Sequence, residues 1–115
     1  MATKAEIRDR AAHDLGILEL NQNLQSQDDT RISDAYDEVY AALKRKGQAT
    51  WASTGSVPDE LTPHVAALVA ENCLSTYAVS QARFARIKEA ARLAGLEIPE
   101  LTASYYNDYT EAVDY

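Results

Sequence analysis

One stripe of apolar residues in the middle of the chain constrains the fold most. Ile32, Tyr36, Val39 and Leu43 recur at intervals of three and four residues. This spacing places side chains on one face of an α-helix, whereas a strand would need an alternation of period two. The segment is therefore predicted to be an amphipathic helix, which must bury its apolar face against other elements.

The ends of this helix are also marked in the sequence. Ser26 and Asp29 restart the helical pattern, and Gly47 follows it. Three consecutive basic residues precede the glycine: Lys44, Arg45 and Lys46. Cations are favoured at the negative end of a helix, so this run is sufficiently explained as a partner of the helix dipole, although it is also a candidate subunit or channel contact.

Three further helices are expected. Thr3 and Glu6 fit a capping box, and Gly16 supplies a stop for a first helix. Thr62 as N-cap and Pro63 in the first turn begin another, whose nearly apolar circumference predicts a central position. A last helix starts at Ser80 and is expected to end at Gly95, with Pro99 beyond. Its buried face is predicted to contain Phe84, Ile87, Ala91 and Ala94.

The remaining segments read as connections. Residues 17–25 show no regular period, and residues 48–59 are punctuated by Ser, Thr, Gly and Pro, which favours a loop or a short hairpin. Trp51 is expected to anchor the second connection, either on its own bundle or on an adjacent subunit. No strand pattern longer than a few residues competes, so the fold class is all-α, a compact bundle of about four helices.

Composition limits the classes of protein further. A length of 115 residues suits one core, and a net charge of −7 argues against a surface that grips nucleic acid or anionic lipid throughout. The lone Cys73 excludes an intramolecular disulfide and suggests a reducing compartment. The charged N-terminus and the short apolar runs predict neither a signal peptide nor a membrane span.

The C-terminal segment differs from the rest of the chain. Five acidic residues and no Lys or Arg follow Arg92, and four of the seven tyrosines lie in the final eleven positions. Tyrosine is enriched at interfaces, which favours a helical domain of residues 1–101 followed by an extended docking arm of residues 102–115. An inert frayed terminus is the alternative. The contact residues expected in the arm are Tyr105, Tyr106, Asp108, Tyr109, Glu111 and Tyr115.

Residues able to carry out catalysis do not converge. His64 and Glu71 lie on the same face of the predicted helix. At about 100° per residue, Cys73 lies about 160° around the helix from Glu71, so the three side chains cannot bind one metal ion together. Phosphate loops, nucleophile elbows and zinc-protease motifs are missing from the sequence. We therefore expect no enzymatic activity, no cofactor and no metal.

A helix-turn-helix reading is the main alternative from another class. The two C-terminal helices are joined by a short connection, and Arg83 and Arg86 lie in the first turns of the second. These arginines flank one side of the apolar face, while Lys88 and Arg92 flank the other, so they form no single outward stripe for phosphates. Arg83 and Arg86 are more simply candidate subunit or channel contacts, and a small DNA-binding regulator stays the alternative.

Several segments resemble tailed-phage head-to-tail adaptors, also called connectors, head-completion proteins or tail accessory factors. The likeness runs in order from about Ile7 to about Leu101. The segments that carry it are Ile7 to Gly16, Ala35 to Tyr40, Gly47 to Trp51, Val57 to Leu61, Val65 to Ala70, and Tyr77 to Ser80 before Arg83 and Arg86. Each is a helical packing pattern rather than a chemical signature.

The resemblance implies a structural virion protein of the head–tail junction that is present in the host cytoplasm during assembly. Such proteins are small and α-helical and form a ring, typically of twelve copies, on the portal vertex. They extend the DNA channel, help to retain packaged DNA and receive a tail or nozzle protein. The implied partners are the portal, the tail-side protein, other copies of the chain, and DNA that passes without sequence-specific binding.

Overall fold

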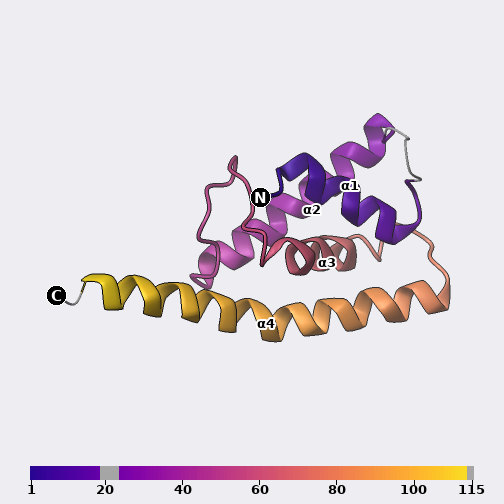
Figure 1. Ribbon diagram of the computed structural model, residues 1–115. Coiled ribbons are helices and arrows are strands. Elements are labelled where there is room, and N and C mark those ends of the chain that lie inside the picture. The colour runs from indigo at the N-terminus through magenta and orange to yellow at the C-terminus, as the bar shows by residue number, and fades with distance from the viewer. Residues whose placement is uncertain (19–23, 114–115) are drawn as a thin grey trace.

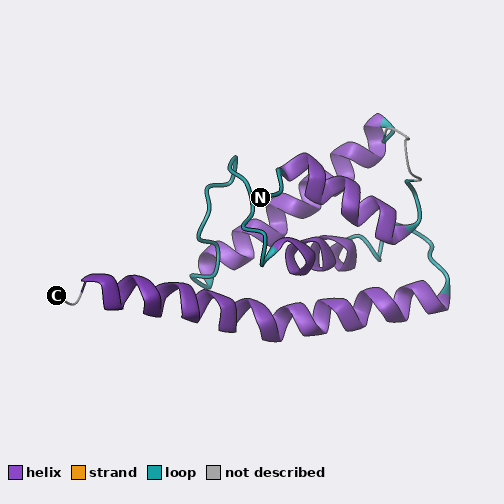
Figure 2. Ribbon diagram, viewed as in Figure 1, coloured by secondary structure: helices purple, strands orange, loops and turns teal. Residues whose placement is uncertain are grey.

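A computed structural model describes the backbone of residues 1–18 and 24–113, and the side chains of residues 1–18 and 24–103. The fold is all-α, as predicted (Figures 1 and 2). Its helices are α1 (Lys4–Leu15), α2 (Ser26–Arg45), α3 (Thr62–Asn72) and α4 (Gln81–Val113). Within the described residues the only strand-like pairing is an isolated antiparallel bridge between Ala2 and Val57. The segment 48–59 is thus a loop rather than a hairpin.

Helix α3 is the centre of the bundle. It packs against α1, α2 and α4, and in Figure 1 it lies between α4 and the other two helices. Its buried residues cover most of its circumference: Val65, Ala66, Ala67, Val69 and Ala70. The small alanines let neighbouring helices approach closely, which explains how an 11-residue helix contacts three partners. The predicted central position is confirmed.

The expected boundaries of α1 are confirmed. The Glu6 amide donates to Thr3 Oγ1 at 3.2 Å, and the Glu6 carboxylate accepts from the Thr3 amide at 3.4 Å, which completes the capping box. At the other end Gly16 has φ of 81°, a left-handed conformation that glycine adopts without strain. The start of α3 differs by one residue, because Leu61 holds the N-cap position and Thr62 is already helical.

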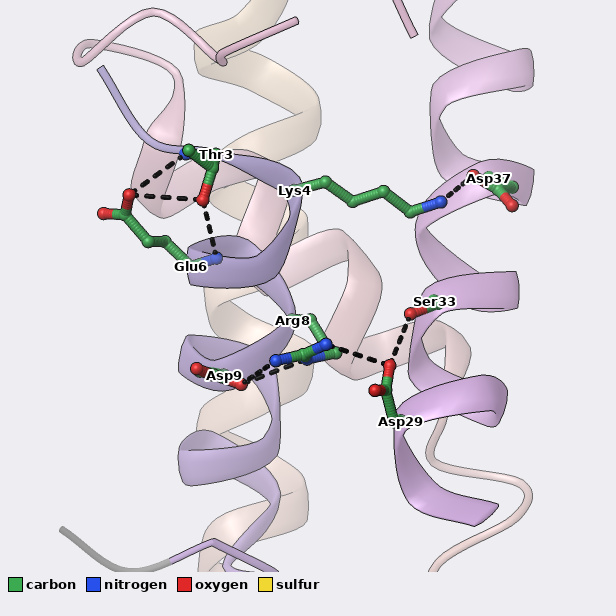
Figure 3. A network of polar contacts seen from close by, with 8 residues as sticks. All are labelled: Thr3, Lys4, Glu6, Arg8, Asp9, Asp29, Ser33 and Asp37. Carbon is green, nitrogen blue, oxygen red and sulfur yellow. Dashed lines mark hydrogen bonds and ion pairs between the residues drawn. The ribbon is translucent and has the colours of Figure 1, made fainter. Parts of the chain in front are cut away.

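Polar contacts fix α1 against α2 (Figure 3). Arg8 Nη1 donates to Asp29 Oδ1 at 2.9 Å, and Ser33 Oγ donates to the same oxygen at 3.0 Å. One turn nearer the N-terminus, Lys4 Nζ lies 2.8 Å from Asp37 Oδ1. Exposed ion pairs contribute about 0–1 kcal/mol each, so these contacts orient two helices whose association is stabilised mainly by burial.

The expected end of the last helix at Gly95 is wrong. Ser80 caps α4 as predicted, with Oγ accepting from the Arg83 amide at 3.2 Å, but the helix continues through Gly95 and Pro99 to Val113. Gly95 and Pro99 are both exposed, so the hydrogen bond that proline cannot donate to the Gly95 carbonyl is lost at the surface of the bundle. Beyond Pro99, Thr102 is 6% exposed, and between the two breakers Ile98, only 1% exposed, continues the apolar stripe. Its burial offsets the local cost of the two helix breakers.

The expected domain boundary after residue 101 falls inside α4. Thr102 is buried, and its hydroxyl donates to the Gln48 carbonyl at 3.5 Å, so the helix still contacts the loop after α2 at this point. Beyond it, α4 continues past the C-terminal end of α2 toward one extremity of the molecule (Figure 1). The largest dimension, 52 Å, is close to the length of about 50 Å that 33 helical residues span.

The described part of the chain has no helix that is both long enough and apolar enough to span a lipid bilayer.

Candidate interaction surfaces

Trp51 packs onto its own chain. Its side chain is 7% exposed, and its Nε1 donates to the Tyr36 hydroxyl at 3.1 Å. The Tyr40 hydroxyl in turn donates to the Trp51 backbone carbonyl at 2.8 Å, and the two rings meet edge to face with centroids 5.9 Å apart. Trp51 thus joins the loop of residues 48–59 to α2 by an aromatic contact and two hydrogen bonds.

Burial also favours the neutral, protonated form of the Tyr36 hydroxyl. Tyr36 is fully buried, and desolvation raises the pKa of its hydroxyl above the ordinary value. The hydroxyl is neutral at physiological pH and accepts the hydrogen bond from the indole N–H without placing a charge in the core. Lys4 Nζ lies 5.6 Å from the Tyr36 ring centroid, which links this cluster to α1.

The basic run at the end of α2 lies on the surface. Lys44, Arg45 and Lys46 are all exposed. They lie at the C-terminal end of α2, where the helix dipole is negative and favours basic residues. The backbone amide of Lys46 donates to the Ala42 carbonyl at 3.2 Å. Among the described residues none of the three makes an ion pair, so their charges are accessible to another molecule.

Arg83 and Arg86 have different environments. Arg83 Nη1 donates to the Asp14 carbonyl at 3.0 Å, and its guanidinium lies over Gly16, where an added Cβ would be 3.0 Å from Arg83 Cζ. Arg83 therefore satisfies the C-terminal carbonyls of α1 and joins α1 to α4. Arg86 is exposed and makes no such described contact.

This difference gives a testable prediction about stability. Replacing Arg83 with Ala should lower the free energy of unfolding by about 1 kcal/mol, because the α1 carbonyls lose a charged donor. The matched variant Arg86→Ala should change it by less than about 0.5 kcal/mol, as exposed substitutions usually do. Urea unfolding followed by circular dichroism measures both. Equal losses for the two variants would contradict the assigned role of Arg83.

The outward face of α4 carries exposed apolar side chains that sequence reasoning missed. Leu93 is 43% exposed and Leu96 is 58% exposed. The spacing of the sequence could have indicated this exposure. At about 100° per residue, both leucines lie far around the helix from the buried stripe that contains Ile87 and Ile98. Phe84, predicted to be buried, is 43% exposed; it lies in the first turn of α4, where its ring contacts Lys88 with Nζ 5.9 Å from the centroid.

A groove lies between α2, α3 and α4. It has a volume of about 400 Å³. Its apolar lining consists of Val39, Ala42, Leu43 and Leu68. Its polar lining consists of Glu38, Lys46, Glu71, Asn72 and Lys88. Two of the polar groups are joined across the groove, since Lys88 Nζ lies 3.5 Å from Glu71 Oε2.

Glu71 and Cys73, which were considered for catalysis, and the second histidine, His13, have structural surroundings, and Glu71 pairs with Lys88. Cys73 is fully buried, and desolvation raises the pKa of its thiol, which disfavours the reactive thiolate. His13 Nδ1 lies 2.9 Å from the Leu18 carbonyl, so it holds the chain that leaves α1. Within the described residues no group of three or more His, Cys, Asp and Glu side chains is placed to hold a metal ion.

The expected docking residues of the C-terminal arm lie outside the described side chains. This applies to Tyr105, Tyr106, Asp108, Tyr109, Glu111 and Tyr115. Their docking role stays a prediction from composition.

Comparison with known proteins identifies no relative, since no family model, curated protein or solved structure matches the chain.

Proposed function

We propose that this protein is a structural subunit of a phage head-to-tail adaptor, bound as a ring to the portal vertex at the head–tail junction. In this role it extends the DNA channel, helps to retain the packaged genome and presents a platform to a tail or nozzle protein. The role needs no cofactor or catalytic group. It needs a rigid body, lateral contacts between copies and a segment that reaches another protein.

The course of α4 is the observation that carries the proposal. The helix crosses the whole bundle and continues past α2, and its last part contains acidic and tyrosine residues without any Lys or Arg. A self-contained four-helix bundle has no need of such a continuation. A subunit that must reach a portal does, because tyrosines supply contact area and acids favour a basic or amide-rich receiving surface.

The exposed leucines of α4 support lateral contacts that are weak individually. Complete burial of one leucine contributes about 1.5–3 kcal/mol, and Leu93 and Leu96 are already partly covered. Association itself costs about 4–15 kcal/mol in lost rigid-body freedom, so two such residues do not hold a stable pair alone. On a portal each added copy binds the template and a neighbour together, which raises the effective concentration. The isolated chain is therefore expected to be monomeric.

The contacts of Arg83 weigh against the DNA-binding alternative. A recognition helix presents its first turns to base edges, but Arg83 in the first turn of α4 is directed to the α1 carbonyls. An adaptor should show no sequence-dependent affinity for DNA, whereas a regulator should dimerise and bind a palindromic site in a salt-dependent way.

Co-sedimentation tests the proposal. The chain is mixed with DNA-filled, tail-less heads of its parent phage, and bound protein is measured after centrifugation. Saturable binding to portal-containing heads, with none to particles assembled without portal, is the expected result. Equal binding to both particles, or no binding together with tight binding to specific DNA, would overturn it.

A further inference from the structure

Two surfaces of the chain offer apolar side chains to another molecule. The first is the groove between α2, α3 and α4, with its apolar lining of Val39, Ala42, Leu43 and Leu68. The second is the ridge formed by Leu93 and Leu96 on the outward face of α4. We infer that the groove receives the Leu93–Leu96 ridge of a second copy, which is the lateral contact that the proposed ring requires. This inference rests on the proposed function and identifies the contacting residues.

The dimensions of the two surfaces are compatible. A groove of about 400 Å³ that is open to solvent has room for two leucine side chains presented one turn apart. Leu93 and Leu96 lie three positions apart in the sequence, so they project from neighbouring turns on the same side of α4. Burial of these side chains against the apolar lining removes exposed leucine surface and covers the opening of the groove in the same contact.

Charges on the two surfaces are complementary at the Lys46 end of the groove. Glu97 and Glu100 border the ridge, and the nearby pair of Glu89 and Arg92 is internally neutral, with Arg92 Nη2 2.6 Å from Glu89 Oε1. The groove has Lys46 in its lining, next to Arg45 at the end of α2. Of the other charged groups in the lining, Glu38 accepts a hydrogen bond from Asn72 Nδ2 at 3.0 Å, and Lys88 pairs with Glu71. Lys46 has no ion-pair partner among the described side chains, and in the docked pair it would face the carboxylates beside the ridge.

The ridge and the groove lie at different positions on one subunit. Both involve α4, but Leu96 lies about 80° and Leu93 about 140° around the helix from Lys88, which lines the groove, at about 100° per residue. Ridge and groove are thus different patches of one subunit. Where only one ridge and one groove of a pair meet, the contact is heterologous and leaves one ridge and one groove free for further copies, and it forms a ring when the rotation between neighbours closes.

Disulfide trapping of the isolated protein tests this contact without heads. One chain carries Ala42→Cys in the groove, and a second carries Leu96→Cys on the ridge; the native Cys73 is fully buried in both. The two are mixed at high concentration under mild oxidation and separated by mass on a non-reducing gel. A mixed dimer is expected at several times the yield obtained when Thr30→Cys, an exposed position at the start of α2, replaces Ala42→Cys.

A charge exchange provides the second measurement. Lys46→Glu in the groove chain should lower the yield of mixed dimer several-fold, and Glu97→Lys with Glu100→Lys in the ridge chain should restore it. Yields that equal the Thr30→Cys control, or a product dominated by Leu96→Cys chains linked to each other, would overturn the inference.

These results separate the contact from the proposed function. If the chain binds to heads but the groove and the ridge do not cross-link, the adaptor role stands and the assigned contact in the groove is overturned. If Lys46→Glu then weakens attachment to heads, the groove receives the portal or the tail-side protein instead. Cross-linking at the assigned pair without any binding to heads supports the contact and overturns the adaptor role.

Discussion

Removal of residues 104–115 will abolish attachment to portal-containing heads and leave the unfolding of the isolated chain nearly unchanged. The truncated chain keeps Thr102 and its hydrogen bond to Gln48, the last described contact of α4 with the body. It loses the acidic tyrosine-rich segment to which we assign portal binding. Co-sedimentation with heads measures attachment, and thermal circular dichroism measures stability.

Point variants separate side-chain contact from helix length. Substitution of Tyr105, Tyr106 and Tyr109 with Ser keeps the segment's length and charge but removes three aromatic rings, and it should weaken attachment nearly as much as the truncation. Tyr77→Phe, a tyrosine of the body, is the matched control and should attach normally. Attachment of the truncated chain with unchanged affinity would show that the segment is not an arm, and failure of that chain to fold would assign the segment to the core.

Trp51→Ala should produce a large loss of stability. The substitution empties a buried indole site and removes the donor to the Tyr36 hydroxyl, which lies in the core. Large-to-small changes of buried aromatic residues cost about 3–5 kcal/mol. Domains of this size have a total stability of about 5–15 kcal/mol, so the loss is a substantial fraction of the whole. Urea unfolding followed by circular dichroism measures the change.

Trp51→Phe is the matched control for this prediction. It keeps an aromatic ring against Tyr40 and loses the Nε1 hydrogen bond, so it should cost about 1–3 kcal/mol. The Trp51→Phe chain should still attach to heads, because Trp51 packs within its own subunit. An unchanged unfolding midpoint for Trp51→Ala would remove the residue from the account of loop anchoring.

The parts of the fold that were predictable are those governed by local periodicity and capping. The stripe from Ile32 to Leu43, the capping box at Thr3 and the stop at Gly16 depend on neighbours within one or two turns. The end of α4 depends instead on whether burial beyond a helix breaker offsets its cost. Ile98 after Gly95 decides this, and its burial comes from the packing of α4 in the folded bundle.

The interaction surfaces were less predictable for a related reason. The sequence shows that Leu93 and Leu96 lie off the main stripe, but only the packing of α4 shows that the bundle leaves them exposed. The groove is made by residues from three helices that are distant in sequence. The role of Arg83 as a subunit or channel contact stays a prediction. Its contact with the end of α1 was not predictable, because it depends on the chain reversal that brings α4 beside that helix.

Electron microscopy of heads incubated with the purified chain tests the central claim most directly. The adaptor account predicts a ring of additional density at the portal vertex alone, coaxial with the DNA channel, into which copies of the α-helical body fit side by side. Heads without portal should carry no such density. Density distributed over the capsid, or a vertex identical to that of untreated heads at saturating protein, would contradict the account.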